Sequence, residues 1–257
     1  MILAQPMPDA IVVSAVIKRF PVDAAIGGPQ ARGGFFYALD AVSFSIAVGS
    51  CTLIGGANGS GKTLLMAIIA GLDTPDSGAV RCSERVGLVF QDPDSQILGE
   101  TAREDIAFGV RNCGFPKNEI NARVEQALAE TGLGAKADFP SRSLSGGEKR
   151  RLAVAGVLAM DAGIIIFDEP YANMDYPSVL QINRQIQKLK TQGKTSIILS
   201  HEIEKCLGLA DRFIVLHQGQ KVFDGSPAQA LEQNLETWGI RNPLAAQSSS
   251  IGELVWR

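Results

Sequence analysis

The sequence predicts an α/β fold, in which helices cover both faces of a parallel β-sheet and antiparallel structure lies at one edge. Short apolar runs that do not alternate with polar residues are typical of strands buried on both faces. They are residues 51–54, 86–90, 164–167, 196–199 and 213–216. Longer helix-like segments separate them, namely residues 62–70, 117–130, 147–160 and 177–192. Strands that alternate with helices predict a parallel sheet. Residues 38–46 instead alternate polar with apolar, which predicts a half-exposed antiparallel strand.

The composition is that of a folded globular protein. The 257 residues carry 24 Lys and Arg against 27 Asp and Glu, a net charge of −3, and 46% are hydrophobic. These values exclude disordered and fibrous classes. The near-neutral balance also argues against a nucleic-acid partner, which would call for a basic surface. The cysteines are far apart in sequence, with no Cys-x-x-Cys pair, which favours free thiols over a zinc site or disulfides; they are Cys51, Cys82, Cys113 and Cys206.

No segment of the sequence is a candidate membrane span. The most apolar stretch, residues 152–167, is interrupted by Asp161 and Gly163, whereas a span needs about 18 uninterrupted apolar residues. The N-terminus has no basic residues before its apolar part and carries Asp9, which makes it a poor signal peptide. We therefore expect that the chain does not cross a bilayer by itself, although it can lie against one.

A glycine-rich loop follows the first apolar run and matches the P-loop pattern GxxxxGK[ST]. It consists of Gly56, Ala57, Asn58, Gly59, Ser60, Gly61, Lys62 and Thr63. Glycines let the backbone wrap closely around phosphate oxygens, and the following helix N-terminus adds partial positive charge. In such loops the lysine reaches the β- and γ-phosphates and the Ser/Thr hydroxyl binds Mg²⁺. We expect a nucleotide to bind here; a chance glycine turn is the alternative.

Polar residues follow three of the other strands. The run 164–167 ends in Asp168 and Glu169, and an Asp in this position holds Mg²⁺ in P-loop enzymes. Glu169 is suited to polarise the attacking water, although acidic residues beside Pro170 also suit a solvated turn. Gln91 follows the second run and His201 follows the fourth. Because ligands bind at the carboxyl ends of parallel strands, we expect these side chains to converge on one site.

Residues 144–148 (LSGGE) precede another predicted helix. Ser145 and Glu148 fit the Ser-x-x-Glu capping box. A capping box does not explain Gly146 and Gly147. These two glycines leave backbone N–H groups exposed, which predicts a second anion site.

The order P-loop, Gln91, LSGGE, Phe-Asp-Glu-Pro and His201 resembles the ATP-binding-cassette (ABC) ATPase family over residues 11–230. The resemblance implies a RecA-like P-loop NTPase core with a helical subdomain inserted at about residues 95–160. It further implies an ABC ATPase domain at residues 10–230 and a C-terminal tail at 231–257. ATP and Mg²⁺ are the implied ligands, and two subunits sandwich the ATP in a head-to-tail dimer.

The resemblance also implies a role for each motif residue. Ser145, Gly146 and Gly147 would contact the γ-phosphate held by the partner's P-loop, and Asp175 would lie at the dimer seam. The segment 172–175 reads ANMD where the family has SGLD, so this chain departs from the family pattern beside Asp175. Further implied roles are a general base for Glu169, a metal-associated carboxylate for Asp168, metal and γ-phosphate contacts for Gln91, and a switch histidine for His201.

An aromatic residue that stacks on adenine is expected upstream of the P-loop. Phe20 takes this role if residues 21–36 are an insertion, and Phe36 or Tyr37 takes it if they are not. Residues 21–34 are rich in Gly, Pro and Ala and are read as a loop or hairpin, and Phe20 is our preferred candidate.

Residues 91–97 and 104–109 resemble the corresponding stretch of energy-coupling-factor (ECF) transporter ATPases. This implies an importer of a vitamin or a transition-metal ion, with a transmembrane coupling subunit as partner and a peripheral position on the cytoplasmic face of the cell membrane. The second ATPase subunit would be an identical chain or a related paralogue. The alternatives are a non-transport ABC ATPase or the ATPase of another ABC transporter class. A chromosome-type ATPase would need a coiled coil between the P-loop and LSGGE, and no sustained heptad pattern occurs there.

Overall fold

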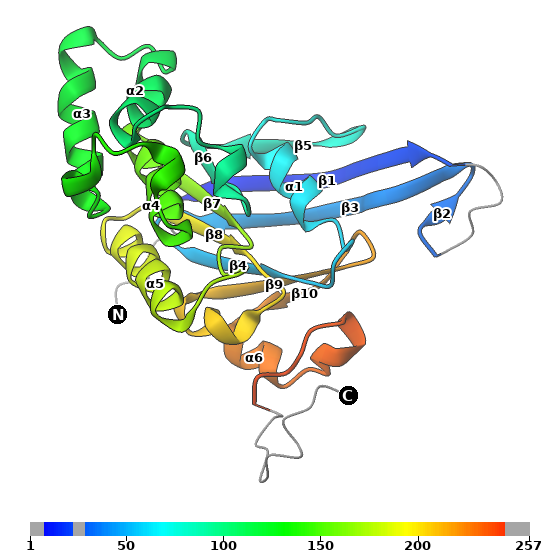
Figure 1. The fold of residues 1–257 in the computed structure, drawn as a ribbon. Helices are drawn as coiled ribbons and strands as arrows, with labels where there is room; N and C mark the ends of the chain where they lie inside the picture. The colour runs from blue at the N-terminus through cyan, green and yellow to red at the C-terminus, as the bar shows by residue number, and fades with distance from the viewer. Residues whose placement is uncertain (1–7, 23–28, 245–257) are drawn as a thin grey trace, which may run out of the picture.

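The computed structural model describes residues 8–22 and 29–244, which form two β-sheets and a helical region beside them (Figure 1). The larger sheet contains all five predicted apolar runs, and its strand order is β10-β9-β4-β8-β7-β6. The bounds are β10 (Gln220–Gly225), β9 (Arg212–His217), β4 (Cys51–Gly55), β8 (Thr195–Leu199), β7 (Ile164–Asp168) and β6 (Val86–Val89). All neighbours are parallel except β10, which pairs antiparallel with β9. The predicted α/β fold with a parallel core is confirmed.

Strand β7 shows why these runs lack polar alternation. Ile165 and Phe167 pack into one hydrophobic cluster, whereas Ile164 and Ile166 pack into another. All four are essentially inaccessible to solvent. The sheet therefore lies between two cores, and every position along the strand must be apolar.

The second sheet is antiparallel, with strand order β2-β3-β1-β5. Its bounds are β2 (Ala31–Arg32), β3 (Phe35–Ala47), β1 (Asp9–Pro21) and β5 (Ser77–Cys82). The alternating run 38–46 lies in β3, as predicted. Helix α1 (Lys62–Ile69) lies between the two sheets, because its buried Leu65 and Ile69 join Leu39 of β3 and Ile54 of β4 in one cluster. Part of the predicted loop, residues 23–28, lies outside the described residues.

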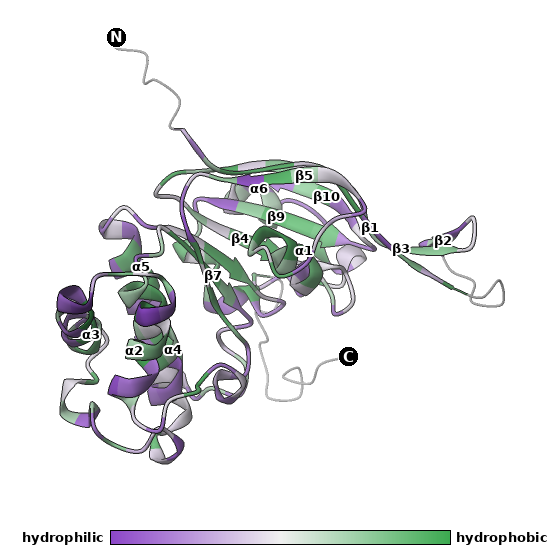
Figure 2. Cartoon of the chain, turned by 90° about the horizontal axis from the view of Figure 1, so that it is seen from above, coloured by the Kyte–Doolittle hydropathy of each residue, from purple (hydrophilic) through white to green (hydrophobic). Residues whose placement is uncertain are grey.

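A helical region packs beside the larger sheet (Figure 2). It contains α2 (Ala102–Asn112), α3 (Lys117–Glu130) and α4 (Gly146–Ala159). Ile106, Leu128 and Leu152 form its separate hydrophobic core. On another face of α4, Val154 and Val157 belong to the core of the sheet. Helix α4 therefore joins the two cores, and it lies within the expected helical subdomain 95–160.

The remaining helices pack on different strands of the larger sheet. Helix α5 (Tyr176–Thr191) contacts β8, whereas α6 (Pro227–Leu231) and the 3₁₀ helix η6 (Leu235–Trp238) follow β10 and contact β9. Leu235 and Ile240 are buried in the sheet's core. The expected tail 231–257 thus contributes core residues at its start, while residues 245–257 lie outside the described part of the chain.

Two further results concern the class of protein. In the described ranges 8–22 and 29–244, no helix is both long and apolar enough to span a bilayer. All four cysteines are free thiols, as predicted.

Candidate functional site

The P-loop connects β4 to α1 and requires glycine at two positions because other backbone lies so close. A Cβ atom on Gly56 would lie 2.2 Å from the carbonyl oxygen of Leu216, and one on Gly61 would lie 2.7 Å from that of Ala38. Both glycines also have positive φ values, of 149° and 102°. The loop is therefore shaped by the ends of β9 and β3, which hold its backbone against the start of α1.

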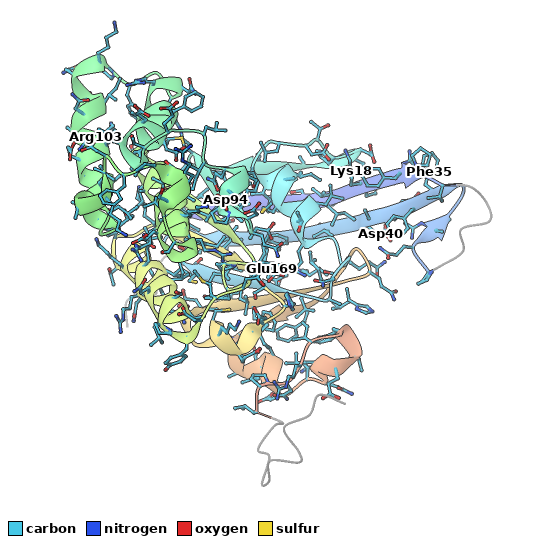
Figure 3. All side chains as sticks on the ribbon, in the orientation of Figure 1. Lys18, Phe35, Asp40, Asp94, Arg103 and Glu169 are labelled. Carbon is cyan, nitrogen blue, oxygen red and sulfur yellow. The ribbon has the colours of Figure 1, made fainter. Side chains whose placement is uncertain are left out.

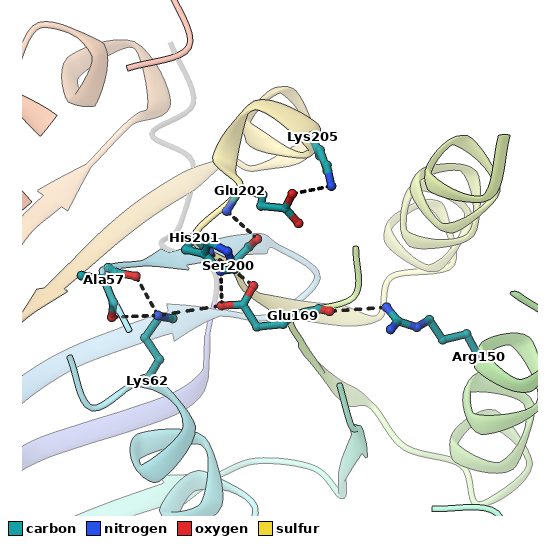
Figure 4. Close-up of polar contacts among 9 residues, drawn as sticks. Ala57, Lys62, Arg150, Glu169, Ser200, His201, Glu202 and Lys205 are labelled. Atoms are coloured by element: carbon teal, nitrogen blue, oxygen red, sulfur yellow. Dashed lines mark hydrogen bonds and ion pairs between the residues drawn. The ribbon is translucent and has the colours of Figure 1, made fainter. Parts of the chain in front are cut away.

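Lys62 is folded back over this loop. Its Nζ donates hydrogen bonds to the carbonyl oxygens of Gly56 (2.7 Å) and Ala57 (3.2 Å) and lies 3.8 Å from Glu169 Oε1 (Figure 4). Burial lowers the pKa of Lys62, and the charges of Glu169 and Asp168 oppose that effect. The P-loop and Glu169 together line a cavity of about 340 Å³. A cationic lysine and a helix N-terminus at one cavity make it a site for an anion.

The two carboxylates after β7 occupy different surroundings. Burial and the neighbouring charge of Glu169 raise the pKa of Asp168 to about 6. Among the described residues, its buried Oδ1 has no hydrogen-bond partner, and neither has the buried Oγ of Ser60 in the P-loop. A buried, unpaired carboxylate oxygen is costly unless a further ligand meets it. The site thus offers an oxygen donor suited to a hard cation such as Mg²⁺.

Glu169 is held at both its backbone and its side chain. Its φ of +42° is a strained, left-handed value for a non-glycine residue. The Glu169 N–H donates to the carbonyl oxygen of Leu199 at 2.9 Å. His201 Nδ1 lies 3.0 Å from Glu169 Oε1, and the His201 N–H donates to Oε2 at 3.4 Å. The ends of β7 and β8 therefore bring Glu169 and His201 together beside Lys62 of the P-loop. Glu169 lies near the centre of the molecule (Figure 3).

Five further predicted site residues line a second cavity, of about 640 Å³. Those that line it are Gln91, Ser145, Gly146, Gly147 and Asp175. Gln91 and Glu169 line different cavities of one chain, but their carbonyl oxygens accept from the same guanidinium, that of Arg150, so the two residues are neighbours.

The LSGGE segment forms the predicted helix cap. Ser145 Oγ accepts a hydrogen bond from the Glu148 N–H (3.3 Å), and the Ser145 N–H donates to Glu148 Oε2 (2.9 Å). Lys136 lies 2.6 Å from Glu148 and, with the cap, lowers the pKa of Glu148 to about 2. Asp175 caps α5 by accepting from the Ser178 N–H at 3.1 Å. Hydrogen bonds from the side chain and then the backbone of Ser178 lower the pKa of Asp175.

Phe20 lines neither cavity. It pairs in register with Phe36 of β3, and its side chain is 44% exposed. Opposed residues of an antiparallel pair share a face of the sheet, so Phe20 and Phe36 are neighbours. The other candidate, Tyr37, lies against Arg32, whose Cζ is 3.9 Å from the centroid of the Tyr37 ring.

Two features of the site escaped the sequence interpretation. After η6, a Cβ atom on Gly239 would lie 2.9 Å from Ala57 Cβ, and Ile240 reaches within 3.3 Å of the position of a Cβ on Gly55. The C-terminal segment therefore supports the base of the P-loop. Its signal was the apolar spacing of Leu235, Trp238 and Ile240. The second feature is the buried Arg150. In the sequence it is one of three consecutive basic residues, 149–151, and nothing there distinguishes it from the other two.

The family model for ABC transporters matches residues 39–172. The chain belongs to the ABC transporter ATP-binding family. An energy-coupling factor transporter ATP-binding protein, EcfA of Carboxydothermus hydrogenoformans, is 39% identical over 233 residues, which cover 82% of this chain and 85% of the relative. Membership of this ABC family implies ATP binding and hydrolysis.

Two solved ABC structures are similar. The cbiO1 protein of Clostridium perfringens, described as part of the ABC transporter complex cbiONQ, has a TM-score of 0.75 at 29% identity and covers 92% of this chain and 97% of its own. The cassette MJ0796, described as a dimeric post-hydrolysis state bound to ADP and Pi, has a TM-score of 0.71 at 26% identity and covers 84% and 98%.

Proposed function

We propose that this chain is the ATPase subunit of an ECF-type ABC importer for a vitamin or a transition-metal ion. The support for this subgroup is the similarity to an ECF transporter ATPase and to cbiO1. In this proposal the chain is peripheral, on the cytoplasmic face of the membrane, and Phe20 stacks on adenine. The ATPase of another ABC transporter class is the alternative.

The proposed reaction is attack of water on the γ-phosphorus, with Glu169 as general base. The P-loop N–H groups and Lys62 would bind the phosphates, while His201, 3.0 Å from Glu169, would keep that carboxylate oriented. Thr63, Gln91 and Asp168 would hold Mg²⁺, which supplies charge neutralisation on the phosphates when bound. The unpaired Oδ1 of Asp168 supports this assignment. Positioning and charge stabilisation then account for most of the rate.

The observation that carries a head-to-tail dimer is the division of the motif residues between two cavities. The P-loop and Glu169 line one, whereas Ser145, Gly147 and Asp175 line the other. In a head-to-tail pair, the second cavity of each chain would face the P-loop of its partner and complete it. The dimeric state described for MJ0796 supports this arrangement.

Mixing two inactive variants tests the dimer. Lys62→Ala disables the P-loop of its own chain, and Ser145→Arg disables the segment offered to the partner. In a mixed dimer both defects fall in one site, and the other site is intact. We expect each variant alone to be inactive and the mixture to recover roughly a quarter of the wild-type rate, because half of the dimers then hold one intact site of two.

The matched control is a mixture of Lys62→Ala with Glu169→Gln. These residues serve the same site of one chain, so each site of the mixed dimer keeps one defect and no activity should return. Glu169→Gln alone should retain ATP binding, lose turnover by about 10²-fold or more and accumulate an ATP-bound dimer. Equal recovery in both mixtures, or in neither, would contradict the dimer.

Exposed apolar side chains on the helical region support a transmembrane partner. Leu98 is 70% exposed, Phe108 48% and Phe139 51%. Co-purification from solubilised membranes should yield integral membrane subunits, and Phe108→Asp should reduce their yield while leaving the ATPase of the purified chain intact. Capture of no integral membrane protein by the wild-type chain would contradict the importer assignment.

A further inference from the structure

Arg150 is a buried cation in the second turn of α4. Its side chain belongs to the basic run 149–151, but unlike Arg151 it is only 5% exposed. Burial lowers the pKa of Arg150, and the charge of Asp92 opposes this. Among the residues that the structure describes, Arg150 forms no ion pair with a carboxylate. A buried charge without a counter-ion is retained only where other groups compensate for the lost water.

Main-chain carbonyl groups supply that compensation. Nη2 of Arg150 donates to the carbonyl oxygens of Gln91 (2.8 Å) and Ala172 (3.2 Å). Nη1 donates to the carbonyl oxygen of Glu169 (3.4 Å; Figure 4) and to that of Pro170. One guanidinium therefore joins α4 to the segment after β6 and to the segment after β7. Because the acceptors are carbonyl groups, the contacts fix backbone positions directly.

These contacts coincide with the strained backbone at Glu169. Its φ of +42° is maintained only if the surroundings hold both of its peptide groups. The N–H of Glu169 donates to Leu199 of β8, and its carbonyl oxygen accepts from the Ala172 N–H (3.2 Å) and from Arg150 (3.4 Å). Of these three contacts, Arg150 supplies the one that comes from the helical region.

A neighbouring contact reinforces the link to Gln91 but cannot replace it. Lys149 Nζ lies 2.5 Å from Oδ1 of Asp94, a residue in the segment that follows Gln91. The Asp94 side chain is 63% exposed, and exposed pairs of this kind contribute little. The buried guanidinium is thus the main connection between the first turns of α4 and the residues at the strand ends.

We propose that Arg150 is a positioning residue that fixes the backbone of Glu169 and Gln91 relative to the LSGGE end of α4. This inference rests on the proposed function, in which that end of α4 contacts the partner's nucleotide. A displacement of α4 upon nucleotide binding in the partner is then transmitted through Arg150 to the proposed base of the same chain. Arg150 touches no reacting atom in this scheme.

Arg150→Lys is the decisive variant, because a lysine keeps the charge but cannot span four carbonyl groups. We expect kcat to fall about 10- to 100-fold, as for a small misplacement of a catalytic group. The Kd for ATP measured on the P-loop should stay within about twofold of wild type, because Arg150 does not line that cavity. Arg151→Lys is the matched control: Arg151 is adjacent, donates to Gln181 at 2.7 Å on the surface, and should tolerate the change.

Amide hydrogen exchange of the nucleotide-free chain separates positioning from general stability. In Arg150→Lys, peptides covering residues 90–96 and 168–174 should exchange faster, while the rest of the chain stays as in wild type. A wild-type kcat, unchanged exchange in those peptides, or faster exchange throughout the chain would each overturn the proposal. Exchange of the nucleotide-free chain does not depend on dimer formation or a membrane partner, so failure here is distinct from failure of the mixing experiment.

Discussion

The P-loop and the LSGGE segment are both glycine-rich and both precede a helix, but the atoms around their glycines differ. In the P-loop, Gly56 and Gly61 have positive φ, and a Cβ on either would lie within 2.7 Å of backbone of the same chain. At the start of α4, a Cβ on Gly146 would have no atom of the described residues within 4 Å, and one on Gly147 would meet Ser178 Oγ at 3.5 Å.

This difference indicates what each loop is built to contact. The fold of a single chain already requires glycine in the P-loop. Nothing within the described residues requires it at Gly146 or Gly147, where the helix would be more stable with alanine. The requirement must then come from a surface outside the chain, which agrees with the proposed contact to a nucleotide held by the partner.

The largest effect is expected from Gly56→Ala. The added methyl would overlap the carbonyl oxygen of Leu216 and disfavour a φ of +149°, so β4, β9 and the loop cannot all keep their positions. We expect ATP binding to be lost and the free energy of unfolding to fall by about 2–4 kcal/mol. Thermal unfolding and nucleotide titration measure both. Gly208→Ala, where a Cβ meets nothing within 4 Å, should leave both unchanged.

Gly147→Ala should separate function from stability. The free energy of unfolding should stay level or rise by up to about 1 kcal/mol, because alanine favours the helix. ATP binding to the P-loop should match wild type, while hydrolysis should fall about 10²-fold, since the methyl would occupy the surface offered to the partner's nucleotide. Steady-state hydrolysis and thermal unfolding of the same variant test this prediction. Normal turnover of Gly147→Ala would contradict the proposed contact with the partner's nucleotide.

Gly239→Ala tests whether the C-terminal segment supports the P-loop. Its Cβ would lie 2.9 Å from Ala57 Cβ, so we expect a rise of a few fold in the Kd for ATP besides a loss of about 1 kcal/mol in stability. Gly132→Ala is the matched control: both glycines have a φ of +69°, but a Cβ on Gly132 meets nothing within 4 Å. A similar Kd for the two variants would show that Gly239 affects only its own turn.

The sequence predicted the parallel core well because each strand is apolar on both faces. The predicted run 164–167 and the observed β7 differ by one residue, and the predicted helix 117–130 coincides with α3. Strand β1 was missed, because its polar and apolar residues follow no regular alternation across several register shifts.

The sequence predicted the individual motifs of the site, but it could not predict how they are arranged in space. A motif fixes Lys62 or Ser145 by local spacing, whereas the division between two cavities depends on how α4 packs against the sheet. Arg150 is the clearest case. Its neighbours Lys149 and Arg151 reach the surface, and only tertiary packing distinguishes the residue between them.

The smallest effects concern pH, and they have opposite signs at the two loops. The pKa of Asp168 beside the P-loop is raised to about 6, against about 3.9 in an unfolded chain. A raised carboxyl pKa gives a contribution to stability that is complete below pH 4 and is lost as the pH rises through 6. The pKa of Glu148 is lowered to about 2, so its contribution is complete above pH 4.5 and is lost as the pH falls toward 2.

Thermal unfolding of the nucleotide-free chain at pH 5 and pH 8 tests these signs. Asp168→Asn removes the buried charge, so it should raise the unfolding temperature by about 2–4 °C at pH 8 and by less at pH 5. Glu148→Gln should lower it at both values, because Glu148 is ionised and paired with Lys136 throughout this range. If Asp168→Asn were destabilising at pH 8, the carboxylate would be compensated within the chain. The P-loop site would then be electrostatically complete without a ligand, and the contrast between the two loops would be confined to their glycines.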